Sequence, residues 1–150
     1  MIELSRQREI EADPATVWAV LSDFGSISAW AANVDHSCLM SAQTGGVGAR
    51  RRIQAGPLTL VETVTEWEPE QMLAYEISGL PPLVQGVTNR WQIDATTANA
   101  SRVTLSTNIR PGQRPPQRLA ARALGRRLMQ ASDQMLDGLQ ARATSGGSQR

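Results

Sequence analysis

Residues 114–143, RPPQRLAARALGRRLMQASDQMLDGLQARA, decide the fold of this chain. After Pro115 and Pro116 the run contains strong helix formers and no further proline, which predicts a single helix to about Ala143. With a turn of about 100° per residue, one arc of this helix collects Leu119, Ala120, Ala123, Leu124, Leu128, Ala131, Met135 and Leu139. No other segment predicts a helix of this length, so this one is expected to cover a large apolar surface.

The segments before this helix predict strands. Apolar residues alternate within 34–41, 48–54, 58–66, 72–78, 86–94 and 102–110, and turn residues separate these ranges. Connections this short allow only antiparallel neighbours. A further strand is expected at Ile2 to Glu11. After it, Asp13 and Pro14 predict the start of a helix over 14–22, and a second short helix is expected from Ser26, carrying Trp30.

This order predicts an α+β helix-grip fold. A curved seven-stranded antiparallel sheet would wrap around the long C-terminal helix, with two short helices after the first strand. We expect a single domain over 1–144 and a disordered tail over 145–150.

The amino-acid composition excludes several classes of protein. The chain has 150 residues, 41% of them hydrophobic, and a net charge of +1, which suits one soluble core. A single cysteine excludes an internal disulfide, and with only one histidine a structural zinc site is not expected. No run is long enough to span a membrane, and residues 1–6 lack the apolar core of a signal peptide, so we expect a cytoplasmic protein without integral membrane association.

The basic residues carry two further signals. All fifteen are arginine, which indicates a GC-rich and, we expect, bacterial genome. They are also unevenly distributed, because residues 1–94 hold six arginines against twelve acidic residues, whereas 95–150 hold nine against two. The C-terminal third is therefore strongly basic.

Several stretches resemble the START-like, helix-grip superfamily, and within it the polyketide cyclase/dehydrase-like (SRPBCC) group. They are REIEADPATVW at 8–18, LSDFG at 21–25 leading to Trp30, GVGARR at 46–51, Glu62, LAY at 73–75 and RWQI at 90–93. The resemblance covers nearly the whole chain. It implies a hydrophobic-ligand fold that is shared by lipid carriers, hormone receptors and aromatase/cyclases.

Two charges are expected on the inner face of the sheet. If Ile53 faces Leu58 across a four-residue turn, Arg51 faces Leu60 and Ala49 faces Glu62, on a side that is otherwise apolar. Arg51 and Glu62 should therefore pair or face a cavity. Two interpretations stay open, namely a polar anchor for a ligand carbonyl or carboxylate and a structural ion pair.

Further candidate ligand-binding residues follow from the same alternation. The full set is Trp30, Arg51, Glu62, Tyr75, Asn89, Trp91, Thr107 and Arg127. Tyr75, Asn89 and Thr107 would need hydrogen-bond partners in an apolar interior, either a ligand or the protein itself. Arg127 falls within the apolar arc of the long helix, and the small residues Ala120, Ala123 and Ala131 of that arc would leave volume unfilled.

Other motifs in the sequence have simpler structural explanations. Arg118, Arg122 and Arg126 form a stripe that could meet an anionic lipid surface or be only the solvated side of the helix, and the lack of interleaved aromatic residues argues against nucleic acid. His36 and Cys38 lie about 7 Å apart along a strand, too far for an activated thiolate. No motif predicts a cofactor, whether metal, nucleotide or flavin.

Three functions remain. The first is a non-catalytic protein that binds a hydrophobic or aromatic small molecule, lipid or polyketide-like, between sheet and helix. The second is an enzyme similar to polyketide aromatase/cyclases, in which Arg51, Tyr75 or Glu62 polarises a carbonyl or moves a proton. The third is a protein-interaction module that uses the Arg118, Arg122 and Arg126 face. The oligomeric state and the catalytic residues, if any, cannot be inferred from the sequence.

Overall fold

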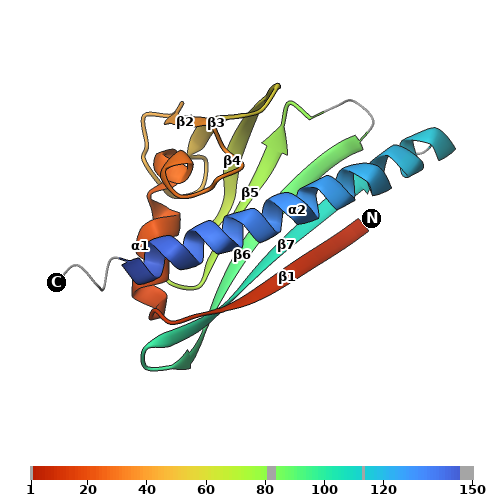
Figure 1. Ribbon diagram of the computed structural model, residues 1–150. Coiled ribbons are helices and arrows are strands. Elements are labelled where there is room, and N and C mark those ends of the chain that lie inside the picture. Colours follow the sequence, from red (N-terminus) through yellow and green to blue (C-terminus); the bar gives the residue numbers. More distant parts are fainter. Residues whose placement is uncertain (1, 81–83, 113, 146–150) are drawn as a thin grey trace.

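The computed structural model describes residues 2–80, 84–112 and 114–145 (Figure 1). In chain order the elements are β1 (Ile2–Ile10), α1 (Pro14–Ser22), the 3-10 helix η1 (Phe24–Ala29), β2 (His36–Leu39), β3 (Arg50–Ala55), β4 (Leu58–Glu68), β5 (Met72–Ser78), β6 (Val84–Thr97), β7 (Ala100–Pro111) and α2 (Pro115–Ser145). Of the predicted tail at 145–150, Ser145 is instead the last residue of α2, and 146–150 lie outside the described residues.

The seven strands form one antiparallel sheet in the order β1-β7-β6-β5-β4-β3-β2. Figure 1 shows this sheet curving around α2, with α1 at the C-terminal end of that helix. The predicted helix-grip fold is therefore confirmed. The inward positions of β5, β6 and β7, such as Leu73, Trp91 and Leu105, are almost wholly buried and form the core, as their alternation predicted.

The β3–β4 hairpin differs from the predicted register. Ala55 pairs with Leu58 across a two-residue turn, so Arg51 lies directly opposite Glu62 and not opposite Leu60. Gly56 adopts a φ of +57°, the left-handed conformation that tight hairpin turns require. The predicted and observed registers differ by two residues, so both place Arg51 and Glu62 on the inner face.

Helix α2 is rotated relative to the predicted arc. Its buried residues are Ala121, Gly125, Ser132, Met135, Leu136, Leu139 and Ala143. Leu119 is 67% exposed, and Ala123 is also exposed, so both were wrongly assigned to the covered face. Alanine and leucine occur around the whole first half of this helix, so the apolar pattern there does not define one face. Figure 1 also shows the first turns of α2 reaching beyond the end of β1.

Polar contacts and close packing hold α2 in place. Arg6 of β1 pairs with Asp133 at 3.2 Å, and Arg8 donates to Asp137 at 2.6 Å and to Gln140 at 2.9 Å. In the same part of the helix, Gly138 lies against the carbonyl oxygen of Trp30, so closely that a methyl group at this position would overlap it. The C-terminal half of α2 is therefore fixed to both β1 and the segment after η1.

Helix α1 begins as predicted. The Asp13 carboxylate accepts a hydrogen bond from the Thr16 backbone N–H at 2.8 Å, and Pro14 occupies the first turn. Hydrogen bonding from the Thr16 side chain, and next from its backbone N–H, lowers the pKa of Asp13. The cap fixes where the chain turns from β1 into α1, and α1 in turn leads to η1, which reaches the buried polar residues described next.

Candidate functional site

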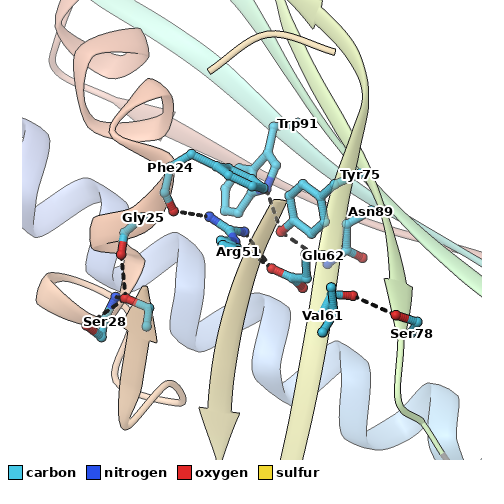
Figure 2. A network of polar contacts seen from close by, with 11 residues as sticks. Phe24, Gly25, Ser28, Arg51, Val61, Glu62, Tyr75, Ser78, Asn89 and Trp91 are labelled. Atoms are coloured by element: carbon cyan, nitrogen blue, oxygen red, sulfur yellow. Dashed lines mark hydrogen bonds and ion pairs between the residues drawn. The ribbon is translucent and has the colours of Figure 1, made fainter. Parts of the chain in front are cut away.

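A buried ion pair lies on the inner face of β3 and β4 (Figure 2). The Arg51 Nε and Nη2 atoms both lie 2.7 Å from Glu62 Oε1, and Nη1 donates to the Phe24 carbonyl oxygen at 2.9 Å. Arg51 and Glu62 are only 2% and 3% exposed. The two charges compensate each other directly across the hairpin, and the carbonyl oxygen of Phe24 in η1 accepts a further N–H of the arginine.

Two aromatic rings pack against the arginine. The Arg51 guanidinium carbon lies 3.8 Å from the centroid of the Phe24 ring and 4.7 Å from that of Tyr75. At these distances the ring faces attract the cation. Arg51 thus contacts protein groups both through its N–H donors and through two aromatic rings.

A second polar network follows from Tyr75 on β5. Its hydroxyl oxygen accepts from Trp91 Nε1 at 3.2 Å and from Asn89 Nδ2 at 3.4 Å (Figure 2). Asn89 Oδ1 in turn accepts from Thr107 Oγ1 at 2.7 Å. Burial, and next the negative charge of Glu62, raise the pKa of the Tyr75 phenol. These four residues therefore form a connected network across β5, β6 and β7.

A cavity of about 380 Å³ lies between α2 and the β3–β5 side of the sheet. Its wall is apolar apart from four side chains, Asn33, Glu62, Asn89 and Arg127. The apolar part is formed by Ile27, Val34, Ile53, Ala55, Pro57, Leu58, Leu60, Ile77, Leu80, Leu124, Leu128, Ala131 and Met135. Glu62 and Asn89 are buried whereas Arg127 is exposed, so one polar group of the wall lies at the surface and two lie deep.

Comparison with known proteins identifies the family. The sequence profile of the polyketide cyclase/dehydrase and lipid-transport family matches residues 1–144. The chain belongs to this family. No curated protein matches the sequence.

Solved structures similar to this family member share its fold. The Zhui aromatase/cyclase from a Streptomyces species aligns with a TM-score of 0.81 at 15% identity, over 95% of this chain and 93% of that one. A Thermobifida fusca protein gives 0.75 at 26% identity, over 95% and 91% of the two chains. A START superfamily protein from Mycobacterium smegmatis gives 0.73 at 11% identity, over 95% and 97%.

The predicted site residues of this polyketide cyclase/dehydrase and lipid-transport family member fall into two groups. Glu62, Asn89 and Arg127 line the cavity. The others lie outside its wall, and the described contacts connect them to one another: Arg51, Tyr75, Trp91 and Thr107 belong to the two networks, and Trp30 packs edge-to-face on Trp91 at 6.0 Å. The first group therefore borders the cavity, and the second does not.

The sequence did not predict every residue of the cavity wall, and some helix residues that were expected to border the cavity lie elsewhere. Asn33 and Pro57 line the cavity from loops, where no periodicity marks a direction. Asn33 Oδ1 is buried without a hydrogen-bond partner. Of the three small helix residues expected to leave volume, only Ala131 borders the cavity.

The described residues form neither a Cys–His site at the cavity nor a metal site. His36 and Cys38 are both exposed on β2, away from the cavity wall. Within 2–80, 84–112 and 114–145, no three His, Cys, Asp or Glu side chains lie close enough to share a metal ion. In the same ranges, no helix has both the length and the apolar character needed to cross a bilayer.

Proposed function

We propose that the protein binds one hydrophobic small molecule, of lipid or polyketide type, in the cavity between its sheet and α2. The observation that carries this proposal is a hollow of about 380 Å³ whose wall is apolar except for a few polar groups. Cavities of this volume and lining are typical of small-molecule sites. Family membership supports the same class of ligand.

The polar groups of the wall suggest how the ligand is oriented. Both Arg51 contacts go to one oxygen of Glu62, and a carboxylate has about four acceptor positions, so Glu62 retains capacity to accept a ligand hydroxyl. Arg127 offers N–H donors at the exposed part of the wall. We therefore expect a ligand with a hydroxyl or phenol group at its inner end and a carbonyl or acidic group at its outer end.

The protein contacts of Arg51 and Glu62 favour ligand binding over catalysis. Arg51, expected from sequence to contact the ligand, is instead occupied by Glu62, Phe24 and Tyr75. Glu62 is in turn engaged by Arg51. A ligand-orienting role needs no free acid or base, whereas an aromatase/cyclase-like reaction would.

Native mass spectrometry of the protein from its own host, followed by denaturing extraction, tests the proposal. Ala131→Phe places a ring in the cavity, and Ala123→Phe adds the same ring on the exposed side of the same helix. We expect a stoichiometric apolar molecule with the wild type and with Ala123→Phe, and none with Ala131→Phe. An empty wild-type protein whose melting temperature is unchanged by lipids, polyketides and aromatic compounds would refute the proposal.

A second pair of variants tests the orientation. Arg127 borders the cavity, whereas its neighbour Arg126 lies on the other side of α2. Arg127→Met should weaken binding of an acidic ligand by about fivefold, which corresponds to one exposed charge-assisted contact, and Arg126→Met should not. Turnover of a poly-ketone substrate would instead indicate the enzyme.

A further inference from the structure

Two adjoining hollows lie on the opposite side of α2 from the cavity. The first, of about 530 Å³, is lined by Ile2, Gln85, Arg110, Pro111, Gly112, Arg118 and Arg122. The second, of about 340 Å³, is lined by Ile2, Leu4, Arg6, Arg122, Gly125, Arg126, Met129, Gln130 and Asp133. They share Ile2 and Arg122, and we call them together the arginine groove. Among the residues that the structure describes, none lines both the groove and the cavity.

The groove carries uncompensated positive charge. Arg110, Arg118, Arg122 and Arg126 are exposed, and none of them forms an ion pair with an acidic side chain of the described residues. Asp133, the one acidic residue of the lining, is paired with Arg6. Cations gathered in this way repel one another, and a bound anion relieves that repulsion.

The first hollow is shaped around one of these arginines. Gly86 of β6 lies beneath the Arg110 side chain, and a Cβ at this glycine would come within 2.7 Å of Nη2 and 3.1 Å of Nε. The Arg110 guanidinium therefore packs across the backbone of β6. A larger residue at position 86 would displace it, so the absence of a side chain there keeps Arg110 within the groove.

The second hollow is more apolar than the first, although Arg122 and Arg126 also line it. Ile2, Leu4 and Met129 form its apolar surface, and Gly125 leaves space between them. Leu119, on the same helix between Arg118 and Arg122, is 67% exposed. An apolar surface beside clustered arginines matches an amphipathic anion, with its charge in one hollow and its hydrocarbon in the other.

We propose that the arginine groove binds an anionic phospholipid at a membrane surface. The phosphate lies among Arg110, Arg118 and Arg122, and the start of an acyl chain lies against Ile2, Leu4 and Met129. A nucleic acid fits less well, because no aromatic residue on which a base could stack lines either hollow. A free phosphate would contact only the arginines and would not cover the apolar surface of the second hollow.

Vesicle flotation with the full chain tests this proposal. The probes are vesicles of phosphatidylcholine alone and vesicles that also contain about one third phosphatidylglycerol. The wild type should float only with the anionic vesicles, and less so as salt rises. In the variant Arg118→Glu/Arg122→Glu, each reversal should weaken partitioning by roughly tenfold or more.

Matched variants separate the groove from net charge. Arg50→Glu/Arg52→Glu makes the same charge change at exposed positions of β3 and should leave partitioning within about threefold of wild type. Met129→Gln should weaken partitioning without a charge change. All of these variants should keep the wild-type melting temperature, because the replaced side chains are not part of the core.

Four results would overturn the proposal. They are no flotation of the wild type, equal loss in the two charge-reversed variants, unchanged partitioning of Met129→Gln, and full displacement by inorganic phosphate at the concentration of the lipid phosphate. The last would identify a site for free phosphate. None of these results bears on ligand binding in the cavity, which has its own wall.

Discussion

At the scale of single residues, the main feature is the burial of two opposite charges in an apolar interior. Arg51 and Glu62 compensate each other at 2.7 Å, and Phe24 supplies a carbonyl acceptor and a ring face. The pair stabilises the fold only while it is complete, because either charge alone would remain desolvated. Its second effect is to position Glu62 at the cavity.

Removal of one partner should therefore cost more than removal of both. Arg51→Met leaves the Glu62 carboxylate buried without its partner and should lower the free energy of unfolding by about 3–5 kcal/mol. Arg51→Met/Glu62→Leu should recover most of that loss. Urea unfolding of the two variants measures both values, and equal losses would show that the pair does not act as a unit.

Tyr75 makes the free energy of unfolding depend on pH in the alkaline range. Burial holds its pKa above the ordinary 10.0, so above pH 10 the unfolded chain loses this proton while the folded chain keeps it. The contribution is fully present below pH 10 and is lost as pH rises further, with a slope of up to about 1.4 kcal/mol per pH unit.

The composition of this chain leaves little interference with the measurement of this titration. Tyr75 is the only tyrosine and there is no lysine, so no other side chain with an ordinary pKa near 10 titrates there. Phenolate absorbance should appear only as the protein unfolds, and urea unfolding of Tyr75→Phe should lack the alkaline slope. Phenolate formation near pH 10 in the folded protein would contradict the prediction.

At the scale of elements, two glycines decide how strands and helices meet. Gly56 permits the two-residue turn that places Arg51 opposite Glu62. Gly138 lets α2 approach the backbone at Trp30 more closely than any residue with a Cβ could. Both act through the space or conformation that a side chain would remove.

A pair of glycine substitutions in α2 separates helix propensity from packing. In an isolated helix, glycine to alanine would add about 0.5–1 kcal/mol of stability. Gly138→Ala should instead destabilise the protein by about 1–3 kcal/mol, because the new methyl group meets the Trp30 carbonyl.

Gly125→Ala is the control for this substitution. Its Cβ would meet only the ends of the Leu4 and Ile109 side chains, at 3.1 and 3.6 Å, and these can move. Thermal unfolding should show a change within about 1 kcal/mol for Gly125→Ala. Equal effects of the two substitutions would exclude the close approach as the cause.

At the scale of the whole molecule, α2 separates two hollow regions of different chemistry. The cavity beside β3–β5 is mostly apolar with a buried carboxylate, whereas the arginine groove beside β1 is cationic. A ligand that binds only the folded state at one hundred times its Kd should add about 2.7 kcal/mol to the free energy of unfolding. A saturable rise in melting temperature that Ala131→Phe abolishes would be the expected result.

The two regions should act independently. They share no lining residue within the described part of the chain, so Arg118→Glu/Arg122→Glu should leave the cavity ligand's affinity within about twofold of wild type. Titration of the extracted ligand by fluorescence or calorimetry measures this. A large loss of affinity would mean that the two sides of α2 are coupled.

The sequence alone predicted most of the fold and the composition of the inner face. Alternation along a strand depends only on neighbouring residues, so Arg51, Glu62, Tyr75 and Asn89 were placed inward even though the predicted hairpin register was offset by two residues. The long helix was equally predictable from its composition and the lack of internal proline.

Distances between elements were decided only by the tertiary structure. The rotation of α2, its separation from β3–β5 and the arrival of Asn33 from a loop depend on contacts between segments far apart in the chain. Gly138 and the Arg6–Asp133 pair are such contacts, and neither leaves a periodic signal. Local sequence patterns indicate which way a side chain points. The volume between sheet and helix depends instead on all packing contacts together, including those between distant segments.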